Sequence, residues 1–173
     1  MKHVLTTIMT LTLIGWGLLH PAVCKADVYL VAVGISDYPG NENDLNLPIY
    51  DAVDVYDLYK KNTTAHAILL LNQDATIANI ERAMNNLYRQ AKADDIVIFY
   101  FSGHGVAGSF KAYNTSLSYK RIRKAMSMSK SRHKMIFADT CLSGNMRQGK
   151  SDNQQSQESE VMLFLSSRAN EYS

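Results

Sequence analysis

Apolar residues along the chain fall into short continuous runs that alternate with stretches of helical periodicity. The runs at 28–34, 67–71, 95–101, 134–138 and 161–165 have the length and composition of buried parallel strands. Between them, apolar positions recur at helical spacing over 49–60, 77–91 and 118–129, and Thr76 stands where a helix N-cap is expected. Strands that alternate with helices predict an α/β domain in three layers, with a mostly parallel sheet.

Two polar segments interrupt this pattern. Residues 37–47 are rich in Pro, Gly, Asn and Asp, which predicts a loop. Residues 145–160 are rich in Gln and Ser and contain no Val, Ile, Leu or aromatic residue, which predicts a flexible linker. We therefore interpret residues 27–173 as one domain whose last strand follows this linker.

The first 26 residues have the features of a secretory signal peptide. Lys2 and His3 give a short basic start, and an uncharged, mostly apolar run follows from position 4 to 19. Small residues then suit cleavage after Ala26 or Cys24. The run is short for a membrane-spanning anchor, and the residues before Cys24 match a lipid-attachment motif poorly. The sequence thus predicts an exported protein, secreted or periplasmic, with no stable membrane span once the signal is removed.

Charge and cysteine content change this picture only slightly. Lys2 and Lys25 of the leader account for the net charge of +2, because the other 16 Lys and Arg residues balance 16 Asp and Glu residues. A neutral chain gives no general reason to expect nucleic-acid binding, and the basic stretch 111–134 is more typical of a solvated helix face. If Cys24 leaves with the leader, Cys141 has no internal disulfide partner and is either buried or reactive.

Chemically reactive residues follow two of the predicted strands. Ser102-Gly103-His104-Gly105 comes after the third strand, and Asp139-Thr140-Cys141-Leu142-Ser143-Gly144 comes after the fourth. Ligand sites of parallel sheets lie beyond the carboxyl ends of their strands. Either a loop histidine or a buried cysteine would be unremarkable alone, but together they suit a thiol nucleophile with its base. We expect His104 and Cys141 to be catalytic, with the backbone N–H groups of Gly105 and Cys141 as oxyanion donors.

Both motifs, in this order, resemble the histidine and cysteine motifs of the caspase, metacaspase and bacterial caspase-like cysteine peptidases. The similarity extends to an opening strand and turn at 31–38, a helix entry at 50–52 and a substrate-edge segment at 166–171, so it covers roughly residues 28 to 173. The resemblance implies a caspase-like fold and hydrolysis of peptide or protein substrates through an acyl-enzyme on Cys141. His104 would exchange the proton, and no cofactor is expected.

The resemblance also suggests which residues bind the substrate. Asp51 and Asp139 match two acids that line a pocket for Arg or Lys in metacaspase-like members, although the helix dipole alone favours an acid where Asp51 stands. Arg168 lies near the position of an Arg with which animal caspases bind Asp, and Ser166 precedes it on the substrate edge. Two acids against one Arg favour cleavage after Arg or Lys.

The sequence departs from the family pattern in two places. Residues 105–138 contain no Asp or Glu, so the acidic calcium site of some metacaspases has no ligands there, and no metal is expected. Family members usually continue past the fifth strand with another helix and strand, which this sequence lacks. Three alternatives stay open: a fragment, a processed large subunit, or an inactive copy that acts as a binding or regulatory subunit. Another chain is one possible source of the missing elements.

The linker at 145–160 is also a candidate processing site. Arg147 and Lys150 are the only basic residues between Cys141 and Arg168. Flexible polar segments are where proteolysis concentrates, and a tethered segment has a high effective concentration at a nearby site. An acidic pocket would therefore cut the chain itself after Arg147 or Lys150.

Overall fold

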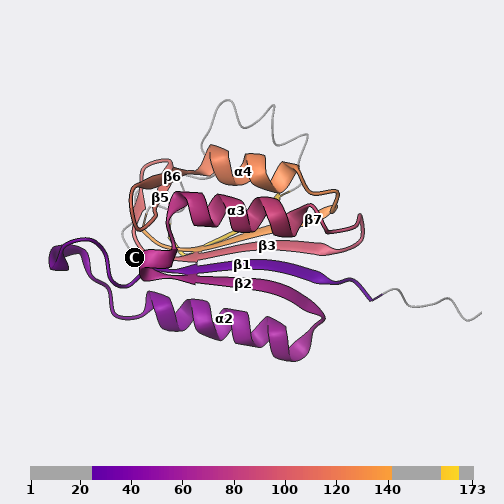
Figure 1. Ribbon diagram of the computed structural model, residues 1–173, viewed down its shortest axis with the longest axis horizontal. Coiled ribbons are helices and arrows are strands. Elements are labelled where there is room, and N and C mark those ends of the chain that lie inside the picture. The colour runs from indigo at the N-terminus through magenta and orange to yellow at the C-terminus, as the bar shows by residue number, and fades with distance from the viewer. Residues whose placement is uncertain (1–24, 142–160, 168–173) are drawn as a thin grey trace, which may run out of the picture.

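Five parallel strands form the central sheet of the computed structural model, which describes residues 25–141 and 161–167 (Figure 1). They are β1 (Val28–Gly34), β2 (Ala65–Leu71), β3 (Ile96–Ser102), β7 (His133–Asp139) and β8 (Val161–Leu165), in the spatial order β2-β1-β3-β7-β8. Every neighbouring pair in this order is parallel. The carboxyl ends of the strands therefore lie at one edge of the sheet.

Helices cover both faces of this sheet. The helix α2 (Pro48–Asn62) packs on one face, and α3 (Ile77–Tyr88) with α4 (Tyr119–Ser127) packs on the other (Figure 1). All seven residues of β1 are buried, because this strand lies between two others and between two helix layers. Its continuous apolar sequence is what such a position requires. The expected three-layer α/β fold with a parallel sheet is confirmed.

The predicted helix over 77–91 is shorter in the structure. Thr76 caps it as expected, since the Thr76 hydroxyl accepts a hydrogen bond of 3.2 Å from the backbone N–H of Asn79. The α-helix ends at Tyr88, where the N–H groups of Gln90 and Ala91 bond to carbonyls three residues back. Ala91 is still buried, so the apolar period continues through a turn that is no longer α-helical.

A small antiparallel sheet, absent from the sequence prediction, lies between β3 and α4. It consists of β4 (Gly105–Val106), β5 (Ser109–Lys111) and β6 (Ser116–Ser118). Strands of two or three residues are too short to give a periodic signal. Phe110 anchors this sheet, because its buried ring stacks on that of Phe101 with centroids 4.4 Å apart. Two short 3-10 helices, η1 (Asn41–Asn43) and η2 (Asn72–Asp74), follow β1 and β2.

Gly34 lets the start of α2 approach the end of β1. A Cβ atom on Gly34 would lie 2.4 Å from the carbonyl oxygen of Pro48 and 2.7 Å from the Cβ atom of Ala52. The helix start is also held by the Ser36 hydroxyl, which accepts from the N–H of Ile49 at 3.2 Å. This close packing brings the first turn of α2 to the carboxyl edge of the sheet.

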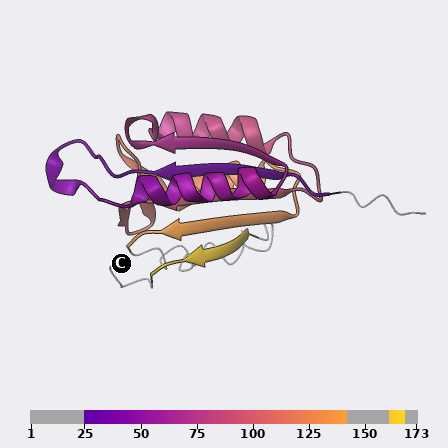
Figure 2. The same ribbon diagram turned by 90° about the horizontal axis from the view of Figure 1, so that it is seen from below.

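The face of the sheet that α2 covers is only partly shielded. Seen from below, α2 lies over the middle of the sheet, whereas no described helix lies over β7 and β8 (Figure 2). Met162 and Phe164 are 55% and 43% exposed there, and the ring of Phe164 stacks on Phe137 at 4.4 Å. Across the described part of the chain, no helix has the length and apolar composition needed to cross a membrane.

Candidate active site

The ends of β3 and β7 bring the histidine and cysteine motifs to the same place. Ser102 and Asp139, the last residues of these strands, are register partners, and the N–H of Gly103 donates to the carbonyl of Asp139 at 3.3 Å. His104 and Cys141 each follow two residues after this pair. The expectation that neighbouring strands carry the two motifs to one edge therefore holds for the backbone.

Gly105 makes the contact between the two motifs possible. A Cβ atom on Gly105 would lie 2.1 Å from the carbonyl oxygen of Cys141 and 2.5 Å from the Thr140 hydroxyl. Any side chain at position 105 must therefore displace the cysteine loop. The Thr140 hydroxyl is buried and has no hydrogen-bond partner among the described residues, so the packing around it is close.

Replacing Gly105 with alanine is expected to separate the two motifs without unfolding the domain. We expect a loss in kcat/KM of about 10²-fold, because a misplacement of about 1 Å between reacting groups has that cost. Peptidase assays and thermal unfolding of the variant would measure both effects. The matched control is Val106→Ala, since Val106 is the next residue of β4 and is already 39% exposed. Activity within twofold of the unmodified protein would show that this contact does not position the site.

The imidazole of His104 is oriented by a backbone carbonyl. Its Nε2 atom lies 2.8 Å from the carbonyl oxygen of Asn43, in η1. A carbonyl oxygen only accepts hydrogen bonds, so Nε2 carries the hydrogen in this contact. In the neutral ring, Nδ1 then has its lone pair available to accept a proton. This tautomer is the one that a general base acting through Nδ1 needs.

The loop that supplies this carbonyl is itself fixed. The Asp44 carboxylate accepts from the N–H of Tyr38 at 3.0 Å, and the N–H of Leu45 donates to the carbonyl of Ser36 at 2.8 Å. The segment 37–47 is a loop, as its composition predicted, and these contacts give it a defined conformation. Nothing in the sequence singles out Asn43, because every residue type has the same backbone carbonyl.

Tyr38 ties this loop to the histidine motif. Its hydroxyl accepts from the N–H of His104 at 2.9 Å and donates to the carbonyl of Lys111 at 3.1 Å. The ring is 2% exposed, and its centroid lies 5.0 Å from that of His104. Burial raises the pKa of Tyr38 to about 12, so the hydroxyl stays protonated at neutral pH and keeps both contacts. Tyr38 therefore positions the backbone at His104.

The cysteine loop is held from its other side by the residues after β8. The Ser166 hydroxyl accepts from the N–H of Thr140 at 3.0 Å, and the Ser167 hydroxyl donates to the carbonyl of Thr140 at 2.9 Å. Ser166, a candidate for substrate binding, thus contacts the residue that precedes Cys141. Cys141 itself is partly accessible.

Asp51 and Asp139 lie close to the same tyrosine. The Asp51 carboxylate, in the first turn of α2, accepts from the Ser102 hydroxyl at 3.1 Å, and Ser102 is the register partner of Asp139. The pKa of Tyr100 is raised to about 12, first by burial and then by the negative charges of Asp51 and Asp139. The structure therefore gathers the two acids that the sequence separates by 88 positions around one strand end.

Three of the expected site residues cannot be placed. Arg168, Arg147 and Lys150 lie outside the described residues, as does the linker 145–160. Within residues 25–141 and 161–167, no group of three or more His, Cys, Asp or Glu side chains is arranged to hold a metal ion.

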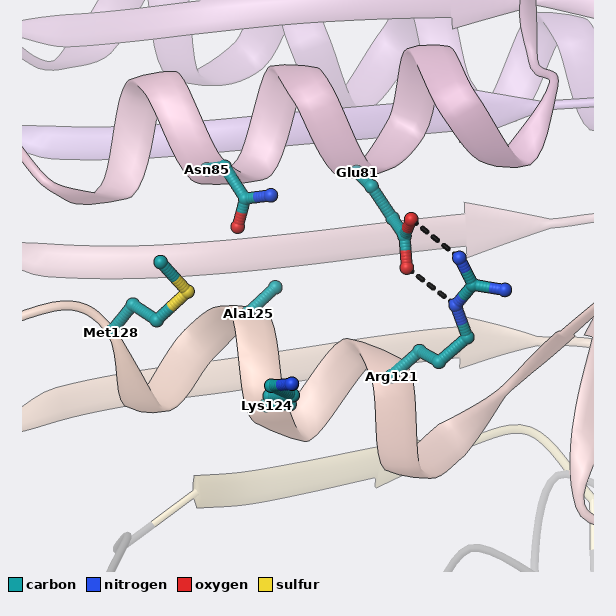
Figure 3. Close-up of a pocket in the computed structure, with 6 residues that line it drawn as sticks. All are labelled: Glu81, Asn85, Arg121, Lys124, Ala125 and Met128. Carbon is teal, nitrogen blue, oxygen red and sulfur yellow. Dashed lines mark hydrogen bonds and ion pairs between the residues drawn. The ribbon is translucent and has the colours of Figure 1, made fainter.

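A concave surface lies between α3 and α4, away from the candidate active site. It has a volume of about 320 Å³ and is crossed by an ion pair in which the Arg121 guanidinium donates to both carboxylate oxygens of Glu81, at 2.5 and 2.6 Å (Figure 3). Its lining residues are Glu81, Asn85, Arg121, Lys124, Ala125 and Met128. Arg121 belongs to the basic stretch 111–134, as does Arg132, which pairs with Asp94. Such pairing is typical of a solvated helix face.

The parallel sheet, with a thiol and an oriented imidazole just beyond two adjacent strand ends, defines an α/β protein with a candidate site at the carboxyl edge of its sheet. Comparison with known families identifies it further: the model of the caspase domain matches residues 28–173, so the chain belongs to the caspase-domain family. That family consists of cysteine peptidases and their relatives, and the family resemblance seen in the two sequence motifs is confirmed.

Comparison with solved structures supports the fold. The crystal structure of protein GSU0716 from Geobacter sulfurreducens is similar, with a TM-score of 0.60 and 19% sequence identity. The similarity covers 68% of this chain and 52% of that one, so the chain spans about half the length of the structure that it matches. At this identity the likeness concerns the fold alone. No curated protein matches the chain significantly.

Proposed function

We propose that the protein is a cysteine endopeptidase that cleaves peptide bonds after Arg or Lys through an acyl-enzyme on Cys141. The observation that carries the proposal is the junction of the two strand-end motifs. Gly105 packs against the backbone of Cys141, while the Asn43 carbonyl holds the adjacent His104 imidazole in the tautomer of a base. A buried structural cysteine and a loop histidine would need neither feature.

In the proposed reaction, the Cys141 sulfur attacks the carbonyl carbon of the scissile bond and its proton passes to Nδ1 of His104. The imidazolium that forms donates more strongly from Nε2 to the Asn43 carbonyl, which stabilises the charge. His104 then gives the proton to the leaving amine as the C–N bond breaks, and water hydrolyses the thioester. We assign the backbone N–H groups of Gly105 and Cys141 to the oxyanion.

The acidic cluster supports the proposed specificity for basic residues. Two carboxylates near one buried tyrosine leave a negative potential that a guanidinium or ammonium group would neutralise. The contact of Asp51 with Ser102 keeps one carboxylate at the strand end instead of in solvent. Ser166 would line the substrate edge beside Cys141, and Arg168 remains a candidate for the same edge.

Labelling with peptidyl electrophiles would test this function directly. The protein is incubated with matched inhibitors that carry Arg, Asp or Leu next to the reactive group, and the adduct is located by mass spectrometry. We expect modification of Cys141 by the Arg compound, prevented by His104→Ala. A Cys141 thiol that reacts with a small alkylating agent but with none of the three inhibitors would support a non-catalytic binding or regulatory subunit instead.

We also expect self-cleavage after Arg147 or Lys150. These residues are the nearest basic ones to Cys141 along the chain, and the tether gives them a high effective concentration. Purified unmodified protein should accumulate a break at one of these positions, whereas Cys141→Ala protein should stay whole. Replacing both residues with Gln should prevent the break without loss of activity toward short peptides. Equal fragmentation of the unmodified and Cys141→Ala proteins would assign the cut to another protease.

A further inference from the structure

A buried carboxylate at the opposite edge of the sheet forms no ion pair with any cationic side chain of the described residues. Asp95, just before β3, is 7% exposed. One of its carboxylate oxygens accepts from the N–H of Lys92 at 2.7 Å, and the other accepts from the N–H of Asp27 at 3.1 Å. Among residues 25–141 and 161–167, no Lys, Arg or His side chain forms an ion pair with it. A buried carboxylate is usually paired with a cation, so two amide contacts leave its charge uncompensated.

A second carboxylate, that of Asp27, lies near Asp95. The pKa of Tyr29 is raised first by burial and then by the charges of Asp95 and Asp27, so both carboxylates act on the same ring. Asp27 is in ion-pair range of His66, whose Nε2 atom lies 3.6 Å from the Asp27 side chain and which is charged only when protonated. A positive charge placed here would therefore be stabilised.

Hydrogen bonds made by Asp27 and Val28 to neighbouring strands and loops fix the position of the Asp27 backbone nitrogen. The N–H of Ile96 donates to the carbonyl of Asp27 at 2.9 Å, and the N–H of Val28 donates to the carbonyl of Thr64 at 2.9 Å. These contacts do not involve Lys25 or Ala26. The nitrogen of Asp27 would thus stay beside Asp95 whether or not any residue precedes it.

We propose that the mature chain begins at Asp27 and that the buried Asp95 carboxylate is the receptor for its α-ammonium group. Cleavage of the Ala26–Asp27 peptide bond adds water across it, so the amide N–H at 3.1 Å from Asp95 becomes an ammonium at the same place. A hydrogen bond from a neutral amide to the carboxylate then becomes a hydrogen-bonded ion pair, in which the donor carries a positive charge as well. Removal of the leader therefore adds an ion pair that stabilises this edge of the sheet, and it does so only if the cut falls at the Ala26–Asp27 bond.

The position of the cut is what distinguishes this proposal from export alone. A cut after Cys24, or a lipid attached to Cys24, would leave Asp27 with an ordinary amide and would place any terminal ammonium two or three residues away. Each residue displaces the terminus by about 3.8 Å, which is beyond hydrogen-bonding reach of Asp95. The proposal is also independent of catalysis, so it can be tested in protein that carries Cys141→Ala.

The first measurement is the N-terminus of the exported protein. The full chain with Cys141→Ala is expressed with its own leader, recovered from the exported fraction, and analysed by intact mass and N-terminal sequencing. We expect a chain that begins at Asp27. A chain that begins at Cys24 or Lys25, that carries lipid on Cys24, or that retains the leader would overturn the proposal.

The second measurement is a cycle of four proteins. Chains that begin at Asp27 or at Ala26 are released from a cleavable fusion, each with Asp95 or with Asp95→Asn, and their thermal unfolding is compared at pH 7. With Asp95 intact, the chain that begins at Asp27 should have a Tm about 3–6 °C higher, as expected when one buried carboxylate gains an ion pair in a domain of this size. With Asp95→Asn, the two starting residues should give the same Tm.

A matched control separates this effect from general loss of stability. The Ser131 hydroxyl donates to the backbone carbonyl of Asp95 at 2.7 Å, so Ser131→Ala disturbs the same turn but leaves the carboxylate in place. It should lower the Tm of both chains equally and preserve the difference between them. Equal Tm values for the two chains with Asp95 intact would overturn the proposal, as would a difference that persists in Asp95→Asn. Because the first comparison needs no Asp95 variant, the test stands even if Asp95→Asn fails to fold.

Discussion

Replacing Cys141 with alanine is expected to lower kcat/KM by about 10⁴-fold or more, and His104→Ala is expected to have nearly the same effect. In the proposed mechanism the thiol forms the acyl-enzyme, so no other side chain substitutes for it. Without the imidazole, the thiol has no base to take its proton, and the leaving amine has no acid to protonate it. Hydrolysis of fluorogenic peptides with Arg before the scissile bond measures both losses.

The two groups should also act as one unit. If the proton of Cys141 passes to His104, the double variant should be no less active than Cys141→Ala alone, because effects within a catalytic unit are not additive. A matched control is His133→Ala, since His133 is exposed and lies at the first position of β7, the opposite end of that strand. This variant should keep full activity, and all four proteins should unfold at similar temperatures. Turnover by Cys141→Ala that is comparable to the unmodified protein would exclude the proposed mechanism.

The sheet could be predicted well because each of its strands has a strong local signal. The runs at 28–34 and 161–165 coincide with β1 and β8, and the other three strands lie within two residues of their predicted bounds. Burial on both faces requires a continuous apolar run, and a run of five to seven such residues between polar segments has few other interpretations. Because β3 and β7 are neighbours in the sheet, the histidine and cysteine motifs that follow them lie side by side.

The orientation of the His104 imidazole could not be predicted in the same way. The Asn43 carbonyl that holds His104 comes from a loop whose sequence indicates only polarity and turn residues. Tyr38 was noticed as part of a family segment, but one of its two hydrogen bonds is with Lys111 of β5, a strand of three residues that gave no signal. Contacts between backbone groups that are distant in the sequence leave no trace in residue type, so they appear only in three dimensions.

Asp51 and Asp139 could be predicted in part: the sequence indicated them as candidates but not how they are placed. Asp51 stands where the dipole of α2 favours any acid, so its residue type alone does not distinguish a substrate contact from a helix-stabilising one. Its hydrogen bond with Ser102, the residue beside Asp139 in the sheet, adds a position at the strand end that the residue type could not show. That contact depends on the close approach of α2 to β1 at Gly34, which the sequence does not reveal.

Removing the charge of either acid is expected to reduce cleavage after Arg by about thirtyfold to a hundredfold. The loss of one partner of a hydrogen-bonded charge pair costs about 2–5 kcal/mol, and the lower part of that range applies because Asp139 is exposed and Asp51 is half-buried. Asp139→Asn and Asp51→Asn keep the shape of each side chain. The measurement is kcat/KM for matched peptides with Arg, Lys, Leu or Asp before the scissile bond.

A third acid of α2 provides the control. Asp57 is half exposed and forms an ion pair with Lys61 at 3.3 Å, one helical turn away, so Asp57→Asn removes an equal charge from the same helix. It should change cleavage after Arg by less than about twofold, because isolated exposed pairs contribute little. A general electrostatic effect would instead lower activity equally in Asp57→Asn and Asp51→Asn.

The pattern across substrates decides between a basic and an acidic specificity. If Asp51 and Asp139 contact one guanidinium, the double variant should lose less than the product of the two single losses, since residues that share a partner are coupled. The slow cleavage after Leu should be nearly unchanged in every variant, because an uncharged side chain gains nothing from either carboxylate. Preferred cleavage after Asp, with faster turnover in Asp139→Asn, would contradict the proposed pocket and transfer the specificity to a cation such as Arg168.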